Sequence, residues 1–412
     1  MPHQRAQLAI ILGIAQTLAW ASSYYLLAVL AAPISQSIQM PYSRVFAAFS
    51  MALLVSAAVG PYAGRLIDRY GGRYVLMVSN LFFALGLFFL SQATQEVEVF
   101  LAWGLIGVAM GSGLYEAAFA TVVHLYGQQA RTVITGITLL AGFASTVGWP
   151  LSAYLEASYG WQVACLVWAL MHLVIGLPLN ACVAKFKADS EQAQEQGLEQ
   201  PLEHSSESQL EQNSPSSAKE RAFSSPMNKA THYQRTALLM AYVFAVSWFI
   251  STAMAAHLPQ VFQLSGATLV AAIAAASLVG PAQVAGRIIE YSFLKKAHPL
   301  LSARLAIIAH PLAVVSLTLL GASGVSVFAI LHGLGNGILT IAIGTLPLKV
   351  FGAQGYGQRQ GWLMAPARVV QAGAPFLFGL AVASWQSHAL WLSALLALSA
   401  LLALSVMRVK EE

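Results

Sequence analysis

The sequence predicts an all-α integral membrane protein, with twelve transmembrane helices in two pseudo-symmetric six-helix bundles. Three observations predict this fold: recurrent apolar runs, basic residues on one side of them, and an internal repeat. The 412 residues are 58% hydrophobic and 9% charged, whereas a soluble domain carries about 25% charged residues. This composition excludes an ordinary soluble protein. The basic residues lie between the apolar runs, so they do not indicate a nucleic-acid partner.

Apolar runs of about 20 residues, each long enough to cross a bilayer core, recur along the whole chain. We place the spans at 7–31, 42–63, 74–91, 99–124, 132–156, 161–183, 235–258, 267–291, 302–320, 325–348, 360–383 and 388–407. The first run is too long for a signal-peptide core, so we interpret it as an uncleaved span.

The basic residues fall on one side of these spans. With the amino terminus on the inner side, the inner loops carry nearly all Lys and Arg, and the outer loops carry Glu96 and Glu98. Arg44, at the outer edge of the second span, is the exception. Because Lys and Arg are retained on the cytoplasmic side, we expect both termini in the cytoplasm of a multi-pass protein of a bacterial inner membrane.

A break in composition divides the chain into halves. Residues 185–234 are rich in Glu, Gln and Ser without a hydrophobic period, which predicts a disordered linker between bundles at 1–184 and 235–412. The halves resemble each other, since Trp20 and Trp248 differ by 228 in residue number, and Gly111 and Gly335 by 224. A parallel repeat of this kind is typical of transporters that rock two bundles about a central site.

A basic, glycine-rich turn lies between the second and third spans. Its pattern, Gly64-x3-Asp68-Arg69-x-Gly71-Gly72-Arg73, resembles the loop 2–3 signature of the major facilitator superfamily. Within that superfamily, this turn and the segment Ala130-Arg131-Thr132-x3-Gly136 are similar to the monocarboxylate porters and the oxalate/formate exchangers.

The resemblance implies alternating access, with Gly64, Asp68, Arg69, Gly71 and Arg73 gating the inner face. By its own chemistry, Asp68 can lie near the N-terminus of a neighbouring helix or pair with an arginine of the turn. Alternatively, the arginines only set the topology. The repeat partner of the turn, near Lys295 and Lys296, is degenerate, so we expect an asymmetric inner gate.

Three charged residues inside the spans are functional candidates, because charges in a membrane are costly. Arg287 lies where the monocarboxylate porters carry an arginine in the eighth span, and we expect it to contact an anion or to pair with Glu290. Those porters have an Asp one turn earlier, where this chain has Gln283. Arg368 would contact substrate or a gate, or reach the membrane interface. Glu116 would couple protons, or would be hydrogen-bonded or paired with an arginine.

Polar and aromatic stripes suggest the walls of a cavity. Gln16, Trp20 and Tyr24 follow one another at intervals of four residues, and Trp248 and Ser251 share a face of the seventh span. We expect these residues to contact substrate, with ordinary helix packing as the alternative. His172, His310 and His332 also lie in spans, and we expect each to be satisfied by a neighbour.

The leading hypothesis is a secondary active transporter of a small organic anion, a carboxylate by preference, that works by proton coupling or exchange. The alternatives are an efflux pump for drugs, metabolites or metalloids, and a transporter-like sensor. The chain has no phosphate loop or metal-ligand run, so we expect no enzyme, cofactor or metal. The expected partners are the anion, protons or a counter-anion, and the lipid bilayer; we expect a monomer.

Overall fold

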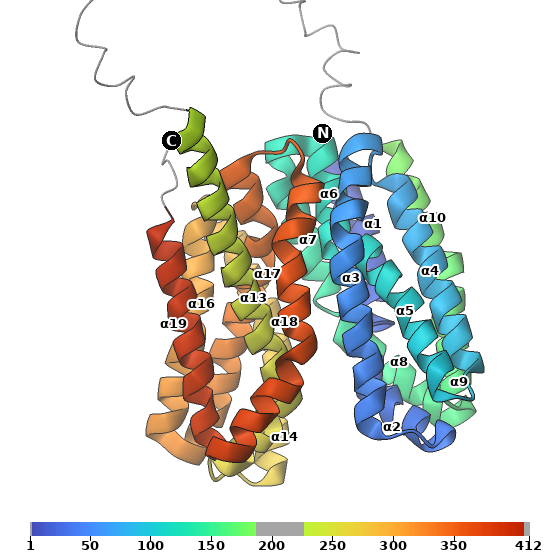
Figure 1. Cartoon of the computed structure of the whole chain (residues 1–412), viewed down its shortest axis with the longest axis vertical. Coiled ribbons are helices and arrows are strands. Elements are labelled where there is room, and N and C mark those ends of the chain that lie inside the picture. The colour runs from blue at the N-terminus through green and yellow to red at the C-terminus, as the bar shows by residue number, and fades with distance from the viewer. Residues whose placement is uncertain (1, 187–225, 408–412) are drawn as a thin grey trace, which may run out of the picture.

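The computed structural model describes residues 2–186 and 226–407, and within these ranges the chain is helical with no strand (Figure 1). Most of the predicted linker lies outside the described residues. Helix α13 starts at Pro226, so residues 226–234, which were predicted as linker, are helical, while the candidate span begins at Tyr233, close to the predicted 235. Both described ends of the chain lie at the same end of the molecule (Figure 1), which we call the termini end.

The helices of the first half are α1 (Pro2–Ala21), α2 (Leu27–Ile38), α3 (Tyr42–Tyr70), α4 (Arg73–Gln92), α5 (Glu96–Gly113), α6 (Tyr115–Tyr126), α7 (Arg131–Ala141), α8 (Ala144–Tyr159), α9 (Trp161–Met171) and α10 (Leu177–Ala181). Those of the second half are α13 (Pro226–Leu264), α14 (Leu269–Ser277), α15 (Val279–Ile289), α16 (Pro299–Leu320), α17 (Val325–Phe351), α18 (Tyr356–Trp385) and α19 (Ala389–Val406). A short π-helix, η5 (Glu290–Leu294), continues α15.

These helices contain the twelve predicted spans. Among the described residues, 8 continuous helical stretches are long and apolar enough to cross a membrane. Three of them, Glu96–Tyr159, Pro299–Phe351 and Tyr356–Val406, each contain two predicted spans. Helix α1 holds most of the first span. The all-α fold of twelve spans in two six-helix bundles is therefore confirmed.

The buried apolar side chains form two separate cores, as two bundles require. The first core extends from Leu8 to Phe186 and includes only Leu348 and Tyr356 from the second half. The second extends from Met240 to Met407. Trp248 packs against both cores, so it lies where the bundles meet.

The first and fourth spans are each broken near the middle of the molecule. The prediction of one continuous helix over 7–31 is wrong, because residues 22–26 form a turn between α1 and α2. The hydroxyl groups of Ser22 and Ser23 both donate to the Ala19 carbonyl, and such side-chain bonds compete with the helical ladder. Leu114 separates α5 from α6, with an extended backbone at φ −82° and ψ −166°.

Candidate functional site

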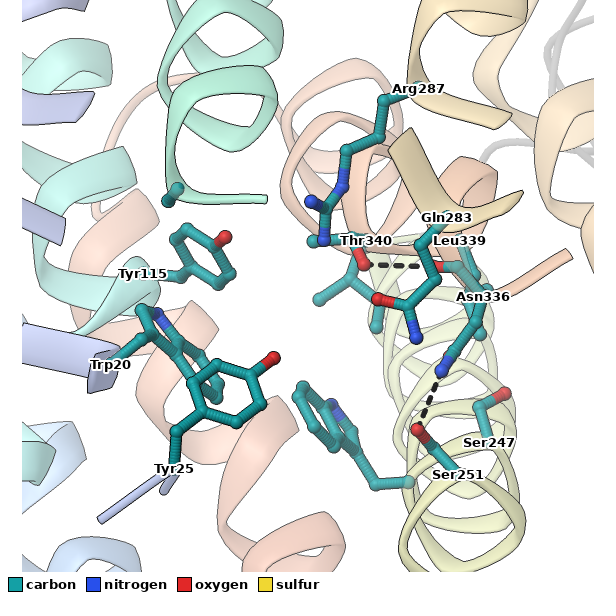
Figure 2. A pocket seen from close by; sticks show the side chains of 13 residues that line it. Trp20, Tyr25, Tyr115, Ser247, Ser251, Gln283, Arg287, Asn336, Leu339 and Thr340 are labelled. Atoms are coloured by element: carbon teal, nitrogen blue, oxygen red, sulfur yellow. Dashed lines mark hydrogen bonds between the residues drawn. The ribbon is translucent and has the colours of Figure 1, made fainter. Parts of the chain in front are cut away.

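A cavity of about 80 Å³ lies between the two bundles, at the level of the helix breaks. It is lined by Trp20, Tyr25, Tyr115 and Ala141 of the first bundle and by Ser247, Trp248, Ser251, Gln283, Arg287, Asn336, Leu339, Thr340 and Ile343 of the second (Figure 2). Its lining residues come from both halves of the chain, so any relative movement of the bundles changes its shape.

Aromatic rings close one side of this cavity. The Trp20 and Trp248 rings stack with centroids 6.2 Å apart and planes 5° from parallel. These two residues are equivalent in the sequence repeat, so the repeat axis runs close to the cavity. The hydroxyl groups of Tyr25 and Tyr115 point toward the same space (Figure 2). The walls therefore combine flat apolar surfaces with hydroxyl groups.

Arg287 brings a positive charge to the cavity, and no carboxylate among the described residues pairs with it. The residue is 5% exposed, and its Nε and Nη1 atoms have no hydrogen-bond partner among the described residues. Its guanidinium group lies against Gly142, where a Cβ atom would come within 2.1 Å of Nη1. The predicted alternative, an ion pair with Glu290, is wrong, because Glu290 pairs with Arg131 at 2.7 Å.

Polar side chains of the second bundle surround the same space. The Asn336 side-chain amide donates to the Ser251 hydroxyl at 2.8 Å, and Thr340 donates to the Asn336 carbonyl (Figure 2). Four lining residues were not predicted from the sequence to contact substrate: Asn336, Thr340, Tyr25 and Tyr115. The signal for Asn336 was available, since it is the central residue of a Gly-x-Gly segment in the second half of the repeat.

Beside the cavity, Arg368 and Glu116 form a buried ion pair between the bundles. Arg368 Nη2 lies 2.8 Å from Glu116 Oε1, with the two side chains 3% and 16% exposed. Arg368 Nη1 also donates to the Gln371 side chain and to the Tyr24 hydroxyl. The predicted alternative that Arg368 reaches the membrane interface is therefore wrong, because local partners hold it inside.

The three residues predicted to share one face, Gln16, Trp20 and Tyr24, have different surroundings in the structure. Only Trp20 lines the cavity. Gln16 Nε2 donates to the Gly113 carbonyl at 2.6 Å, next to the break between α5 and α6. Tyr24 follows the break after α1 and contacts Arg368 instead. For Tyr24, the interval of four residues fails as a guide because the helix ends at Ala21.

At the termini end, a first latch joins the bundles: Asp68 of α3 with the start of α18. The Asp68 carboxylate accepts hydrogen bonds from the backbone N–H groups of Gly357 and Gln358, at 2.7 and 2.8 Å. The free N–H groups and the positive dipole end of a helix favour a carboxylate there. Of the two partners predicted for Asp68, the structure has the N-terminus of a neighbouring helix.

Gly64 lies one turn before Asp68 and allows this approach. A Cβ atom at Gly64 would lie 2.0 Å from the Gly357 carbonyl oxygen. We therefore expect Gly64→Ala to force α3 and α18 apart. The labelling rate of a cysteine introduced between the bundles at the termini end should rise at least several-fold. Gly280→Ala is the matched control, because no atom lies within 4 Å of a Cβ there. Equal labelling of both variants would contradict the prediction.

A second latch at the termini end joins Arg131 of α7 to η5 and to the turn that follows it. Arg131 Nη2 contacts Glu290 Oε1 at 2.7 Å and the Leu294 carbonyl at 2.9 Å, and Nη1 contacts the Ala297 carbonyl. Arg131 and Gln358 differ by 227 in residue number, as do Asp68 and Lys295. The two latches are therefore equivalent in the repeat, although their chemistry differs. The degenerate turn near Lys295 still makes a latch, with Arg131 as its partner.

The remaining residues of the basic turn lie around the first latch. Gly71 has a φ of +79°, a conformation that favours glycine, and it ends α3. Arg69 and Arg73 lie over the rings of Tyr70 and Tyr74, each about 5.2 Å from the centroid. The structure thus brings Gly64 and Asp68 to the second bundle and leaves Arg69 and Arg73 beside tyrosines of their own bundle.

The three buried histidines have the neighbours that the sequence analysis expected. His172 contacts Ser22 at 2.8 Å and Asn80 at 2.9 Å. His310 and His332 contact each other, at 3.0 Å between their Nδ1 atoms. No cluster of three or more metal-ligating side chains occurs in the described part of the chain.

Comparison with known proteins decides the family. A family model described as Major Facilitator Superfamily matches residues 12–327. The chain belongs to the major facilitator superfamily. This is a superfamily of transporters rather than enzymes, and the resemblance seen in the loop between the second and third spans is confirmed.

Individual relatives match this superfamily member over a limited length. Monocarboxylate transporter 2 of Mesocricetus auratus is 29% identical over 153 residues, which is 37% of this chain and 30% of that protein. Agnestins efflux protein AgnL12 of Paecilomyces divaricatus is 32% identical over 126 residues, 30% of this chain and 28% of that protein. The matched segments thus span about a third of each relative's length.

A solved structure matches the whole fold. The proton:xylose symporter XylE, bound to 6-bromo-6-deoxy-D-glucose, superposes with a TM-score of 0.72 over 98% of this chain and 96% of that chain, at 11% identity. At this identity the similarity establishes the arrangement of the helices.

Proposed function

We propose that this superfamily member is a secondary active transporter of a small organic anion, a carboxylate, which binds at Arg287 in the central cavity. The single observation that carries the proposal is the buried Arg287 guanidinium group, which faces a polar cavity without a carboxylate partner among the described residues. An uncompensated buried charge is costly. An anion bound in the cavity would neutralise the charge of Arg287, and Arg287 would in turn stabilise the anion.

The chemistry of the cavity supports a small, planar anion. A guanidinium group binds a carboxylate through two parallel N–H donors, and the Nε and Nη1 donors of Arg287 are unused. The cavity of about 80 Å³ is much smaller than the roughly 300–1,000 Å³ of drug-sized sites. Similarity to a protein named monocarboxylate transporter 2 points to the same class.

The latches and the Arg368–Glu116 pair support alternating access. We place the termini end in the cytoplasm of a bacterium on the strength of the distribution of basic residues. The conformation described here would then be closed on the cytoplasmic side, with both latches formed. Protonation of Glu116 would remove the charge that holds Arg368, so Glu116 would link proton binding to separation of the bundles.

Transport by purified protein in proteoliposomes tests the proposal. We expect uptake of labelled C2–C4 monocarboxylates, with labelled xylose as the neutral control. Arg287→Gln should lower kcat/KM about 100-fold, because charge-assisted hydrogen bonds contribute about 1.5–3 kcal/mol each. Gly142→Ala, which displaces the Arg287 guanidinium group, should lower it in the same direction. Undiminished anion uptake by Arg287→Gln would disprove this site.

An exporter of aromatic compounds is the second candidate. The stacked Trp20 and Trp248 rings and the similarity to a protein named as an efflux protein favour it. Parallel assays in right-side-out and inside-out vesicles distinguish the two candidates. An exporter would accumulate its substrate in inside-out vesicles and would tolerate Arg287→Gln when that substrate is neutral.

A further inference from the structure

A chain of hydrogen bonds links three helices inside the second bundle. His310 of α16 lies between His332 of α17 and Ser393 of α19, at 3.0 Å between the two Nδ1 atoms and at 2.9 Å from His310 Nε2 to Ser393 Oγ. The three residues are buried, with 5%, 6% and 0% exposure. Neither histidine ring contributes to the Arg287 cavity.

The hydrogen bonds determine which nitrogen atoms carry protons when both rings are neutral. Ser393 donates its hydroxyl proton to the Leu390 carbonyl at 2.7 Å, so its oxygen accepts from His310 Nε2. Neutral imidazole has one donor and one acceptor, so His310 Nδ1 is an acceptor. His332 Nδ1 must then be the donor. Among the described residues, no hydrogen bond uses the lone pair of the His332 Nε2 atom.

A small cavity adjoins His332. Its volume is about 30 Å³, and Ser247, Asn336 and Leu339 line both this cavity and the Arg287 cavity. Asn336 lies one helical turn after His332 on α17. His332 is therefore one layer of side chains away from the Arg287 cavity.

We propose that His332 Nε2 is a reversible site for one proton, loaded and unloaded as the transporter binds and releases its anion. The proposal rests on the proposed anion transport and names its coupling group. The proton adds to the free lone pair and no covalent bond breaks. The resulting imidazolium keeps its Nδ1 hydrogen bond to His310, whose acceptor nitrogen stabilises the charged form.

The small cavity beside His332 is lined by no charged side chain, in the described part of the chain, that would repel a proton there. The other lining residues are Val246 and Ile250 of α13, Ala306 and Ile307 of α16, Gly335 of α17, and Ala397 and Ala400 of α19, and none of these carries a charge. His310 is the one other titratable group that lines this cavity in the described structure. A proton at His332 and an anion at Arg287 together add no net charge, so each lowers the electrostatic cost of the other.

Glu116 is less suited to this task in the closed conformation. Its carboxylate is engaged by Arg368 at 2.8 Å, so a proton there must first displace a guanidinium group. His332 needs no such displacement. Replacing whichever group carries the proton should abolish proton-driven transport, so the same assays distinguish Glu116 from His332.

Two transport assays separate proton coupling from anion binding. Accumulation of a labelled C2–C4 monocarboxylate driven by a pH gradient requires net proton movement, whereas counterflow exchange of the same anion does not. We expect His332→Gln to lose gradient-driven accumulation at least 10-fold and to keep counterflow within about twofold of the unmodified protein. His257→Gln is the control, because His257 bonds the Pro375 carbonyl at 2.8 Å outside the chain of three residues.

Nitrogen-15 NMR of histidine in the intact, detergent-solubilised protein provides a test that does not depend on transport or on a variant that folds. We expect His332 to show a protonated Nδ1 and a bare Nε2 at high pH, and Nε2 to gain a proton as the pH falls. A protonated Nε2 at high pH would overturn the proposal, as would full gradient-driven accumulation by His332→Gln. If the unmodified protein moves no carboxylate, the proposed function fails, and the NMR result still decides the protonation of His332.

Discussion

Replacing Asp68 by asparagine is expected to shift the protein from the conformation closed at the termini end toward the open one by about two powers of ten. The Asp68 carboxylate accepts two backbone N–H bonds at the start of α18. Hydrogen bonds to charged groups contribute about 1.5–3 kcal/mol each, and the helix dipole adds about 0.3–1 kcal/mol. Asparagine keeps one acceptor and loses the charge, so a loss of about 3 kcal/mol is expected.

Double electron–electron resonance measures this shift. Spin labels at Tyr74→Cys and Gln354→Cys, in a background with Cys165→Ala and Cys182→Ser, report the separation of the bundles at the termini end. Asp68→Asn should populate longer distances. Arg69→Gln is the matched control, because Arg69 lies over the ring of Tyr70 in its own bundle. Identical distance distributions for the two variants would mean that Asp68 does not hold the bundles together.

Replacing Glu116 by glutamine is expected to destabilise the closed conformation by about 3–5 kcal/mol, the cost of leaving one partner of a buried ion pair uncompensated. Arg368 is 3% exposed and lies over the rings of Trp248 and Tyr24 at 5.0 and 5.7 Å. Its side chain therefore has little access to water while the bundles are in contact. The double variant Glu116→Gln with Arg368→Gln should recover most of the loss, because it removes both charges.

A double-mutant cycle tests this expectation. The melting temperature of the detergent-solubilised protein, measured for the two single variants and the double variant, gives the coupling between the side chains. Both single variants should melt well below the unmodified protein, and the double variant above either of them. Additive losses would show that the pair contributes little, and would also weaken the case for Glu116 in coupling.

The two latches and the Arg368–Glu116 pair are polar connections between the bundles at different depths. The latches lie at the termini end, and the ion pair lies beside the cavity that Arg287 lines. Each is made of groups that water can solvate once the bundles separate. This makes the connections reversible, because the separated state does not leave their charges buried and unpaired.

The charged residues of the spans show how far sequence reasoning can reach. Arg287, Arg368 and Glu116 stand out because a charge in a membrane is costly wherever it lies. Their partners do not stand out, because an ion pair leaves no spacing signal in the sequence. Glu290 is three residues after Arg287, a helical neighbour, and yet it pairs with Arg131, which is 159 residues away.

Helix breaks account for other differences between the predicted and the observed site. Ser22 and Ser23 are ordinary residues within an apolar run, and their bonds to the Ala19 carbonyl end α1. That break brings Tyr25 to the cavity and turns Tyr24 toward Arg368. A hydrophobic period extended through the whole run placed Gln16, Trp20 and Tyr24 on one face, because it assumed that the helix continues.

Composition and charge pattern were enough to show that this protein spans a membrane as two repeated bundles, and they predicted that a few buried charges carry its function. The reason is that the apolar solvent of the bilayer fixes composition and span length residue by residue. Only the tertiary structure decided which charge faces which partner. Arg287 is left facing a cavity, while Arg368 and Arg131 are neutralised across the interface between bundles, because those contacts join residues that only the packing of helices brings together.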